Sequence, residues 1–435
     1  MIRLALSLAS ALLILVLTVL TAQAQAPPVA REVLPNGLTV LVRENDAAPV
    51  VAVSLQVRAG SRFETESTAG ITNFLQRVML RGTARRTAVQ LAEASEDIGG
   101  SLDASGEVEA AEVRGQALSV HWETLLALVA EVVLQPALRP DEIERERRQL
   151  LGQIKSRADA PFSFSFDALM RELYGTNPYG LSHFGYKESI ERLTREDLLA
   201  HYRAVYEPDR MVLAVSGQIE RQRVIKAAER LFGRMARSAP DGRVTPPVGE
   251  PSGGRRVLPR PAQQAQVLVG YLGPGLSDPL YPAVRVLAAA LGGGMAGRLF
   301  VELRDQRGLA YSTGVLTTYR TGAAFFIAYL GTAPASATAS EAGILRELER
   351  VRESPISADE LARAKAYVRG QLVMDRRTNA RVAWYLAFFE TIGAGWDYPD
   401  RYGRAIDAVT VEDVARAAEQ YLKRPSIVVL EPTRR

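Results

Sequence analysis

Three polar side chains between Gly70 and Thr83 have a spacing that could serve a metal ion: Asn73, Gln76 and Arg77. On a helix, residues three and four apart share one face. The inverted zinc motif H-x-x-E-H uses this spacing for two histidine ligands and a glutamate base. A guanidinium, however, stays protonated and repels a divalent cation, and an amide cannot act as a general base near neutral pH. The segment therefore has the spacing of a zinc-binding helix without its chemistry.

The rest of the chain offers no replacement constellation. Its three histidines, His121, His183 and His201, have unrelated spacings, and we expect each of them to be structural. Cysteine is absent, and no Gly-x-Ser-x-Gly elbow stands out. We predict that the chain alone is not a peptidase. The alternative of an independent zinc peptidase with displaced ligands would need about three His, Glu or Asp ligands from elsewhere.

A glycine-rich run in the second half, Leu291–Phe300, precedes two further residues of interest, Arg304 and Tyr311. Its central glycines are Gly292, Gly293 and Gly294. No Lys-Ser/Thr follows the run, so a phosphate loop is not expected. The run could simply end a helix and form a turn. Likewise, Arg304 could pair with Asp305 or Glu302, and Tyr311 could be a core residue.

Strands and helices are mixed along the first half. The β-branched and alternating segments predict strands at 38–43, 50–57, 101–106, 111–118 and 211–216. Helices are predicted at 67–81, 87–98, 121–134, 140–157 and 221–232, and another opens at the capping-box-like Thr194-Arg-Glu-Asp197. These helices must position the three polar residues and any partner for them.

The second half repeats features of the first at nearly constant offsets. Thr410-Val-Glu-Asp413, a helix and a β-forming run at 427–430 echo Thr194-Arg-Glu-Asp197, its helix and the strand at 211–215. In the same way, Asp359-Glu-Leu and Gly370-Gln371 echo Asp141-Glu-Ile and Gly152-Gln153. A chance match of short capping sequences is the alternative. Two matches in register favour a duplicated unit.

The composition shifts to Pro, Gly, Ser and Arg between Ala236 and Ala262, and its prolines disfavour regular structure. We therefore predict a Pro/Gly-rich interdomain linker at 237–262 between an N-terminal domain at 31–236 and a C-terminal domain at 263–435. The predicted fold class is α+β: two duplicated, homologous α+β domains, each a mixed or antiparallel sheet flanked by helices, in a clam-shell arrangement.

The N-terminus has the pattern of a secretory signal. Arg3 is followed by an apolar run, Leu4–Leu20, and by small residues around Ala24. We predict a signal peptide at 1–24 and a periplasmic protein with no membrane contact after cleavage; a retained membrane anchor is the alternative. The formal net charge of +4 is small and the basic residues are dispersed, so no nucleic-acid partner is expected.

From about Val33 to Leu430 the chain resembles the M16 zinc-peptidase family, which includes the insulinase-like and pitrilysin enzymes. The family pattern G-L-A-H-F-L-E-H-M-x-F-x-G-T matches Gly70 and Leu80-Arg-Gly-Thr83, but its His, Glu and His positions are Asn73, Gln76 and Arg77 here. A second pattern, L-G-G-G-x-x-S/A-x-L-F followed by L-R-x-x-x-G-L-A-Y, matches the glycine-rich run and the residues after it.

The resemblance implies roles for particular positions. The third zinc ligand of the family corresponds to Gln153, and an acid that supports the ligands corresponds to Glu146. Arg304 and Tyr311 match an Arg/Tyr pair that contacts the substrate carbonyl and the developing oxyanion, the role of preorganised donors. We further hypothesise that Arg77 forms an ion pair with Glu146 where zinc would sit.

The resemblance thus suggests a non-catalytic subunit of a heterodimeric M16B metallopeptidase. The chain itself would hold no cofactor, and a homologous partner with an intact H-x-x-E-H motif would carry the zinc. Peptides or unfolded proteins would be the substrates of proteolysis. The alternative is a stand-alone pseudopeptidase that acts as a peptide-binding or scaffold protein. Peptides could add as a strand beside 265–272 or 322–330, unless both are simply sheet strands.

Overall fold

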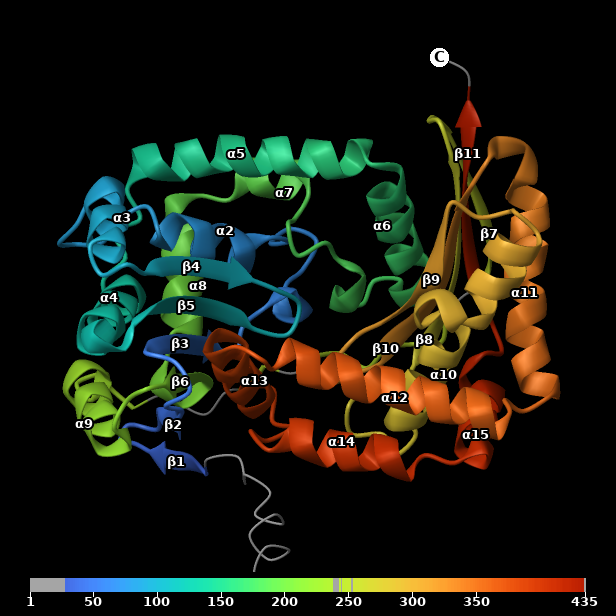
Figure 1. Ribbon diagram of the computed structural model, residues 1–435. Helices are drawn as coiled ribbons and strands as arrows, with labels where there is room; N and C mark the ends of the chain where they lie inside the picture. Colours follow the sequence, from blue (N-terminus) through green and yellow to red (C-terminus); the bar gives the residue numbers. More distant parts are fainter. Residues whose placement is uncertain (1–27, 238–241, 244, 252, 434–435) are drawn as a thin grey trace, which may run out of the picture.

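The computed structural model describes residues 28–237, 242–243, 245–251 and 253–433, so the predicted signal peptide at 1–24 lies outside the described residues. Two sheets occupy separate halves of the molecule, with helices around them (Figure 1). The predicted α+β fold with two domains is confirmed. In the described part of the chain, every helix is too short or too polar to cross a membrane.

The N-terminal half contains a six-stranded sheet with the order β1-β2-β6-β3-β5-β4. The strands are β1 (Val29–Val33), β2 (Thr39–Glu44), β3 (Val50–Val57), β4 (Ser101–Gly106), β5 (Ala111–Leu118) and β6 (Met211–Gly217). The helices are α2 (Ile71–Met79), α3 (Ala88–Glu96), α4 (Trp122–Leu134), α5 (Pro140–Asp159), α6 (Pro161–Tyr174), α7 (Lys187–Arg192), α8 (Arg195–Val205) and α9 (Arg221–Phe232). Predicted strands and helices of this half are all present, with shifts at some ends.

The C-terminal half contains a five-stranded sheet with the order β7-β11-β8-β10-β9. The strands are β7 (Gly254–Pro261), β8 (Ala265–Gly273), β9 (Ser312–Thr317), β10 (Ala324–Thr332) and β11 (Ser426–Thr433). The helices are α10 (Tyr281–Gly292), α11 (Ala337–Glu353), α12 (Ala358–Asp375), α13 (Asn379–Thr391), α14 (Tyr398–Ala408) and α15 (Val411–Tyr421).

The two sheets share one topology, which supports the predicted duplication. In each half one parallel pair, β2 with β6 or β7 with β11, is followed across the sheet by three antiparallel pairings. Strand β1 is an addition at the edge of the first sheet. The echoed capping boxes are also real: Thr194 caps α8 and Thr410 caps α15, each by accepting from the backbone N–H three residues later.

Part of the predicted linker is regular structure, which corrects the expectation that prolines exclude it there. Strand β7 begins at Gly254 and pairs in parallel with β11 as far as Pro261. Proline cannot donate to a sheet ladder, so within sheets it is confined mainly to edge strands. Strand β7 is such an edge, and its two prolines, Pro259 and Pro261, are tolerated because one side of the strand has no neighbour in the sheet.

Helix α2 begins four residues later than predicted. The predicted start was Ser67, but Gly70 has a φ of 88° and breaks the helix there. A Cβ at Gly70 would lie 2.7 Å from the backbone of Gly185, so a side chain is also sterically excluded. The Glu64 carboxylate accepts the backbone N–H groups of Gly70 and Thr72, at 2.7 and 3.0 Å, and satisfies donors at this helix end.

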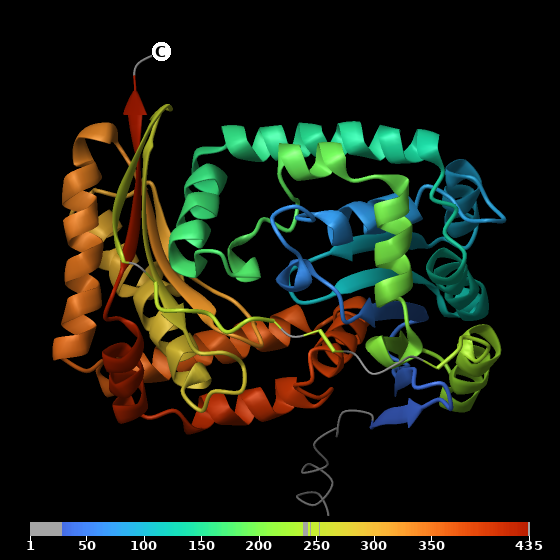
Figure 2. The same ribbon diagram turned by 180° about the vertical axis from the view of Figure 1, so that it is seen from behind.

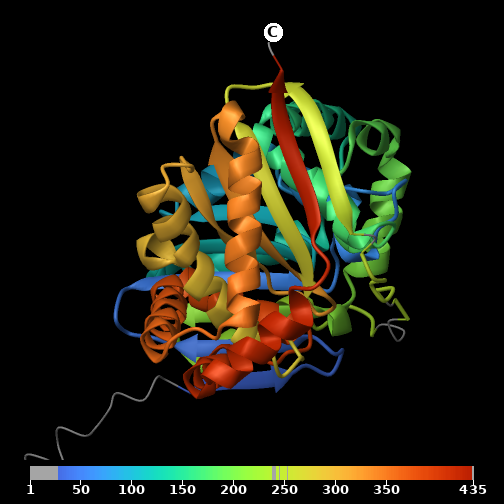
Figure 3. The same cartoon turned by 90° about the vertical axis from the view of Figure 1, so that its right-hand side faces the viewer.

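The halves are joined by a reciprocal exchange of helices. Helix α6 of the N-terminal half packs on β8 and β11 of the C-terminal sheet, and α13 of the C-terminal half packs on β3 and β6 of the N-terminal sheet. Figure 2 shows α6 beside the C-terminal sheet, and Figure 3 shows α11 lying across the opposite face of that sheet. Each sheet therefore buries one face under its own helices and the other under a helix of the other half.

Two apolar clusters form this exchange. One joins Leu169 and Leu173 of α6 to Leu268 and Ile327 of the C-terminal sheet. The other joins α13 to the N-terminal sheet and contains Leu41, Ala52, Val212, Ala214, Val382, Ala383, Leu386 and Ala387. Separating the halves would expose both clusters to water, so the two domains are held together by their cores as well as by the connecting chain.

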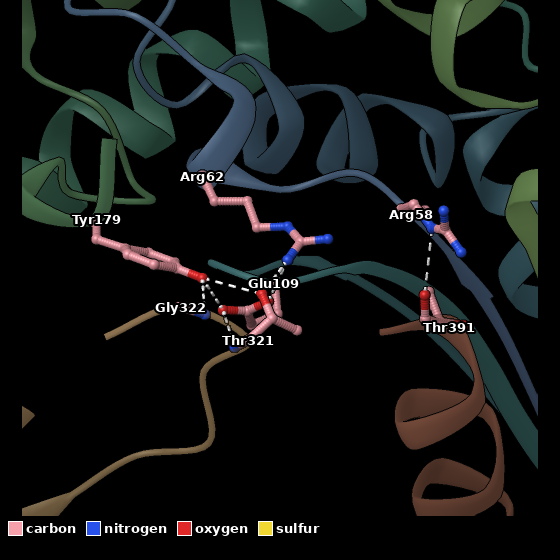
Figure 4. Close-up of polar contacts among 7 residues, drawn as sticks. All are labelled: Arg58, Arg62, Glu109, Tyr179, Thr321, Gly322 and Thr391. Atoms are coloured by element: carbon pink, nitrogen blue, oxygen red, sulfur yellow. Dashed lines mark hydrogen bonds and ion pairs between the residues drawn. The ribbon is translucent and has the colours of Figure 1, made fainter. Parts of the chain in front are cut away.

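A buried polar cluster also bridges the halves (Figure 4). The carboxylate of Glu109, between β4 and β5, accepts from the Arg62 guanidinium at 2.8 Å and from the Tyr179 hydroxyl at 2.7 Å. From the C-terminal half, the Thr321 hydroxyl donates to the same carboxylate at 3.1 Å, and the Gly322 N–H donates to the Tyr179 oxygen at 3.1 Å. Arg62, Glu109 and Tyr179 are buried, and Thr321 and Gly322 are partly buried, so most of these polar groups are shielded from water where the halves meet.

Candidate functional site

Helix α2 places its three polar residues between strand β4 and helix α5. Asn73 is buried, and its Nδ2 donates to the Gly106 carbonyl of β4 at 3.2 Å. Its Oδ1 is buried without a hydrogen-bond partner among the described residues. Gly106 lies so close that a Cβ there would come within 2.6 Å of the Asn73 nitrogen. The start of α2 is therefore fixed tightly against the sheet edge.

Gln76 points into the core rather than toward a substrate. Its side chain has no exposed surface, and its Nε2 and Oε1 lie 2.7 and 3.0 Å from the Tyr206 hydroxyl. Burial raises the pKa of Tyr206 well above its ordinary range, so the phenol stays protonated. The position of the expected general base thus holds an amide that is hydrogen-bonded to a neutral phenol.

Arg77 lies between Glu146 and Gln153 of α5, the two residues to which the resemblance assigned roles in zinc binding. Its Nε donates to Glu146 Oε2 at 3.0 Å, and one terminal nitrogen donates to Gln153 Oε1 at 3.0 Å. The predicted ion pair between Arg77 and Glu146 is confirmed. Arg81, one turn further along α2, also pairs with Glu146, which is 1% exposed. A buried carboxylate is thereby neutralised by two guanidinium groups, the arrangement that burial of charge requires.

The donor set at this place does not fit zinc. A zinc ion needs anionic or neutral donors that converge on it. Here the approach between Glu146 and Gln153 is taken by a permanent cation, and the remaining positions offer amides. Among the described residues, no three His, Cys, Asp or Glu side chains gather in a metal-binding group. We call Asn73, Gln76, Arg77, Glu146 and Gln153 the α2–α5 cluster.

We expect that zinc binding can be restored only by changing this cluster as a whole. The combined variant Asn73→His, Gln76→Glu, Arg77→His and Gln153→Glu supplies three ligands and a base, and should retain about one zinc per chain after dialysis. The matched control lacks the Gln153→Glu change and should retain much less. Metal content is measured by elemental analysis. Stoichiometric zinc in the unmodified protein would contradict the assignment.

Two of the histidines are structural side chains held neutral by their surroundings. His201 Nε2 lies 3.0 Å from the Thr72 hydroxyl, and burial lowers the pKa of His201 to about 4. Burial likewise lowers the pKa of His183 to about 4, beside Phe184. His121 is the N-cap residue of α4. The three do not converge, as their spacing predicted.

The low pKa of His201 gives a pH dependence with a definite sign. As the pH falls from 6.5 to 4, the unfolded chain binds a proton at this residue and the folded chain does not, so the free energy of unfolding falls. At 1.36 kcal/mol per pKa unit the loss amounts to at most about 3 kcal/mol. Denaturation across this range should show a steeper loss for the unmodified protein than for His201→Gln. Parallel curves would rule the shift out.

Arg304 and Tyr311 lie on the surface of the C-terminal half. Arg304 belongs to η6, a π-helical segment (Phe300–Gln306), and its guanidinium lies 4.8 Å from the centre of the Phe300 ring. Tyr311 is 60% exposed at the start of β9. Within the described residues, neither side chain has an ion-pair or hydrogen-bond partner. The alternative of a paired arginine with a core tyrosine is therefore wrong, and both groups are accessible to another molecule.

The structure does not bring Arg304 and Tyr311 into contact with the α2–α5 cluster. The two belong to different halves, and no hydrogen bond or ion pair of the described residues joins them. The glycine-rich run between α10 and η6 has the turn structure offered as its alternative: Gly293 is the C-cap of α10, and Gly294 has a φ of 73°. A Cβ at Gly292 would meet the Val315 nitrogen at 2.4 Å, so α10 needs glycine there to reach β9.

The strands proposed for peptide addition are interior strands. Strand β8, over most of 265–272, pairs with β10 on one side and β11 on the other, and β10 pairs with β8 and β9. Their backbone hydrogen bonds are already made, so neither can accept a peptide strand. The edge strands of the two sheets are β1, β4, β7 and β9, and β4 adjoins α2.

Sequence reasoning missed a cavity of about 660 Å³ in the C-terminal half. It lies between α10, β9 and α12, and its lining includes Arg285, Gln371 and several tyrosines. One sequence feature could have indicated this cavity: Gly370-Gln371 repeats Gly152-Gln153. In a duplicated fold, the region around Gln371 corresponds to the region around Gln153, where the α2–α5 cluster lies.

Comparison with known proteins matches both halves of the chain to related family descriptions. Residues 39–186 match the insulinase family, peptidase family M16, and residues 192–368 match the peptidase M16 inactive domain. A protein named as a zinc protease in Mycobacterium leprae is 32% identical over 417 residues, covering 94% of this chain and 93% of its own. A zinc protease of Streptomyces coelicolor is 26% identical and covers 93% of this chain and 90% of its own.

Solved structures share the fold. A protease from Helicobacter pylori has a TM-score of 0.88 and 22% identity, covering 94% of this chain and 100% of its own. A peptidase M16 inactive domain from Pseudomonas fluorescens has a TM-score of 0.86 and 24% identity, covering 93% of this chain and 98% of its own.

Proposed function

Because this chain belongs to the M16 peptidase family, we propose that it is a zinc-free, non-catalytic subunit of a periplasmic heterodimeric M16 metallopeptidase. In this proposal a homologous partner with an intact H-x-x-E-H motif carries the zinc. The present chain binds peptide or unfolded protein substrates and supplies Arg304 and Tyr311 to the partner's site. Its match to the inactive domain of the family agrees with a non-catalytic role.

One contrast carries the proposal. In the N-terminal half Arg77 fills the approach between Glu146 and Gln153, so the groups that would bind metal are occupied by one another. In the C-terminal half Arg304 and Tyr311 are exposed, with no polar partner among the described residues. Arg304 and Tyr311 could stabilise the negative charge that develops during peptide cleavage. They could do so only if another molecule, here the proposed partner, supplies the zinc site where cleavage takes place.

Strand β4 is the edge that best suits an extended peptide in this proposal. It pairs with β5 on one side and has no neighbouring strand on the other, and it adjoins α2, which carries three residues of the α2–α5 cluster. A peptide added along it would gain main-chain hydrogen bonds irrespective of its sequence. This suits a subunit that must hold varied substrates while the partner cleaves them.

The test is partner-dependent proteolysis. The mature chain is assayed on a quenched fluorogenic peptide alone, with a co-expressed H-x-x-E-H homologue, and with the homologue alone, each with and without a chelator. Cleavage that needs both chains and is stopped by the chelator supports the proposal. Cleavage by this chain alone would overturn it. If neither chain nor the pair cleaves, while the chain binds peptide, the stand-alone peptide-binding protein replaces it.

A further inference from the structure

The cavity in the C-terminal half lies where the duplication repeats the surroundings of the α2–α5 cluster. That cluster belongs to α2 and α5 and lies beside β4; the cavity lies among their counterparts α10, α12 and β9. Gln371 lines the cavity from the position that echoes Gln153. The two places differ in one respect. Arg77 closes the first against a carboxylate of the chain, whereas the second is an open space of about 660 Å³.

A guanidinium group in this cavity has no anionic partner. Arg285 of α10 is partly buried; one terminal nitrogen donates to the Thr317 hydroxyl at 2.6 Å, and its guanidinium carbon lies 5.2 Å from the centre of the Tyr319 ring. It takes part in no ion pair with the described residues. A guanidinium has five N–H donors, so most of its capacity is open to a ligand. Partial burial without a counter-ion is unfavourable, and an incoming anion would relieve it.

The one carboxylate in the cavity wall is already neutralised. Asp375 accepts from Arg381 Nε at 3.1 Å and from the Tyr385 hydroxyl at 2.6 Å. Arg377 adds a further positive charge to the lining. Arg381 neutralises Asp375, so the positive charges of Arg285 and Arg377 remain unbalanced. The cavity therefore attracts an anion and repels a cation.

A buried hydroxyl group stands ready beside the arginine. Tyr402 is 3% exposed, and its hydroxyl interacts with the Arg285 guanidinium without forming a well-aligned hydrogen bond to it or to another described residue. Buried polar groups normally have partners, so a hydroxyl without a well-aligned hydrogen bond in a cavity wall is suited to bind a ligand group. A phenol can donate to a carboxylate oxygen while the guanidinium binds the same carboxylate through two parallel bonds.

The rim of the cavity is apolar. Tyr367 and Met374 of α12 line it and are 41% and 55% exposed. A ligand that fits has a carboxylate for the interior and an apolar group for the rim. Amino acid residues at the end of a peptide, or an acidic side chain with an apolar neighbour, have both.

We propose that this cavity, which we call the Arg285 pocket, binds a carboxylate of a peptide, with Arg285 and Tyr402 as the recognising groups. The pocket is separate from the α2–α5 cluster and from the proposed Arg304/Tyr311 clamp. The inference rests on the proposed function only in taking a peptide as the ligand. It adds that the chain selects its peptides by a negatively charged group.

The experiment measures binding by the isolated full chain, without a partner or metal. Three fluorescent peptides of one apolar sequence are compared by anisotropy: one with a free C-terminal carboxylate, one with a C-terminal amide, and one with the amide and an internal glutamate. We expect the amide without glutamate to bind about tenfold more weakly than the free acid, as the loss of charge-assisted hydrogen bonds predicts. This comparison uses the unmodified protein, so it does not depend on the folding of a variant.

Variants then locate the effect. Arg285→Gln should abolish the preference for the acid, and Tyr402→Phe should reduce it. The control Arg363→Gln removes an exposed arginine of α12 that does not line the pocket, and should leave the preference intact. If the glutamate peptide binds as tightly as the free acid, the pocket accepts acidic side chains. If it binds as weakly as the plain amide, the pocket recognises the C-terminal carboxylate of a peptide.

Equal binding of all three peptides, or a preference that survives Arg285→Gln, would overturn the proposal. Either outcome leaves partner-dependent proteolysis untouched, because that assay reads cleavage rather than the preference for a charged peptide. Conversely, a pocket that binds acids in a chain that never supports cleavage would sustain the inference and not the subunit proposal.

Discussion

Removing one hydroxyl group, in Tyr311→Phe, should lower the turnover of the two-chain complex by about 10²-fold with little change in KM. The reason is that a donor which meets charge formed only in the transition state affects turnover more than substrate binding. Arg304→Ala should cause a loss of similar size. The measurement is steady-state cleavage of the fluorogenic peptide by the reconstituted complex.

The exposure of both residues makes this test clean. Neither side chain supports the fold through a polar contact, so their variants should unfold with free energies within about 0.5 kcal/mol of the unmodified protein. Arg307→Ala is the matched control, because Arg307 is exposed three residues beyond Arg304. Full activity of the double variant Arg304→Ala with Tyr311→Phe would contradict the proposed role of these two residues at the partner's site. It would not affect the conclusion that the α2–α5 cluster does not fit zinc.

Replacing Glu109 with alanine should give the largest loss of stability among the polar variants, about 3–5 kcal/mol of unfolding free energy. The change strands the buried guanidinium of Arg62 and removes the acceptor used by Tyr179 and Thr321. An uncompensated buried charge is more costly than the loss of an average hydrogen bond. Because the cluster joins the two halves (Figure 4), the loss of stability should come from a weaker contact between them.

Denaturant titration followed by circular dichroism and by tryptophan fluorescence measures this loss. Glu250→Ala is the control: Glu250 forms an exposed ion pair with Arg424, and its loss should change stability by less than about 1 kcal/mol. We also expect the two probes to report one transition, because α6 and α13 tie each sheet to the other half. If Glu109→Ala were as stable as Glu250→Ala, the buried polar cluster would not stabilise the contact between the halves as predicted.

Local elements were largely readable from the sequence. The periodicity of 50–57, 101–106 and 111–118 predicted β3, β4 and β5 to the residue, and Thr194 and Thr410 marked the starts of α8 and α15. These features depend on alternation and on capping within a few residues. The misplaced start of α2 had a non-local cause: Gly70 breaks the predicted helix through a close approach to Gly185, which is far along the chain.

The proposed strand-addition site shows the limit of such reasoning. The segments 265–272 and 322–330 are strongly β-forming, but β propensity does not say whether a strand has one neighbour or two. Strand order is decided by which partners meet, and both became interior strands. The same rule explains β7, whose prolines discouraged a strand prediction until the structure placed it at an edge.

By itself, the sequence determined the residue types at the candidate sites: an amide, a second amide and a guanidinium on α2, the pair Arg304 and Tyr311, and the repeated Gly-Gln. Chemistry of this kind follows from side-chain identity and spacing alone. The tertiary structure decided what those residues face. It closed Arg77 on Glu146 and Gln153, left Tyr311 in solvent, exchanged α6 and α13, and opened the Arg285 pocket beside α12. Burial and pairing arise from contacts between segments that lie far apart in the sequence, and a linear pattern does not specify them.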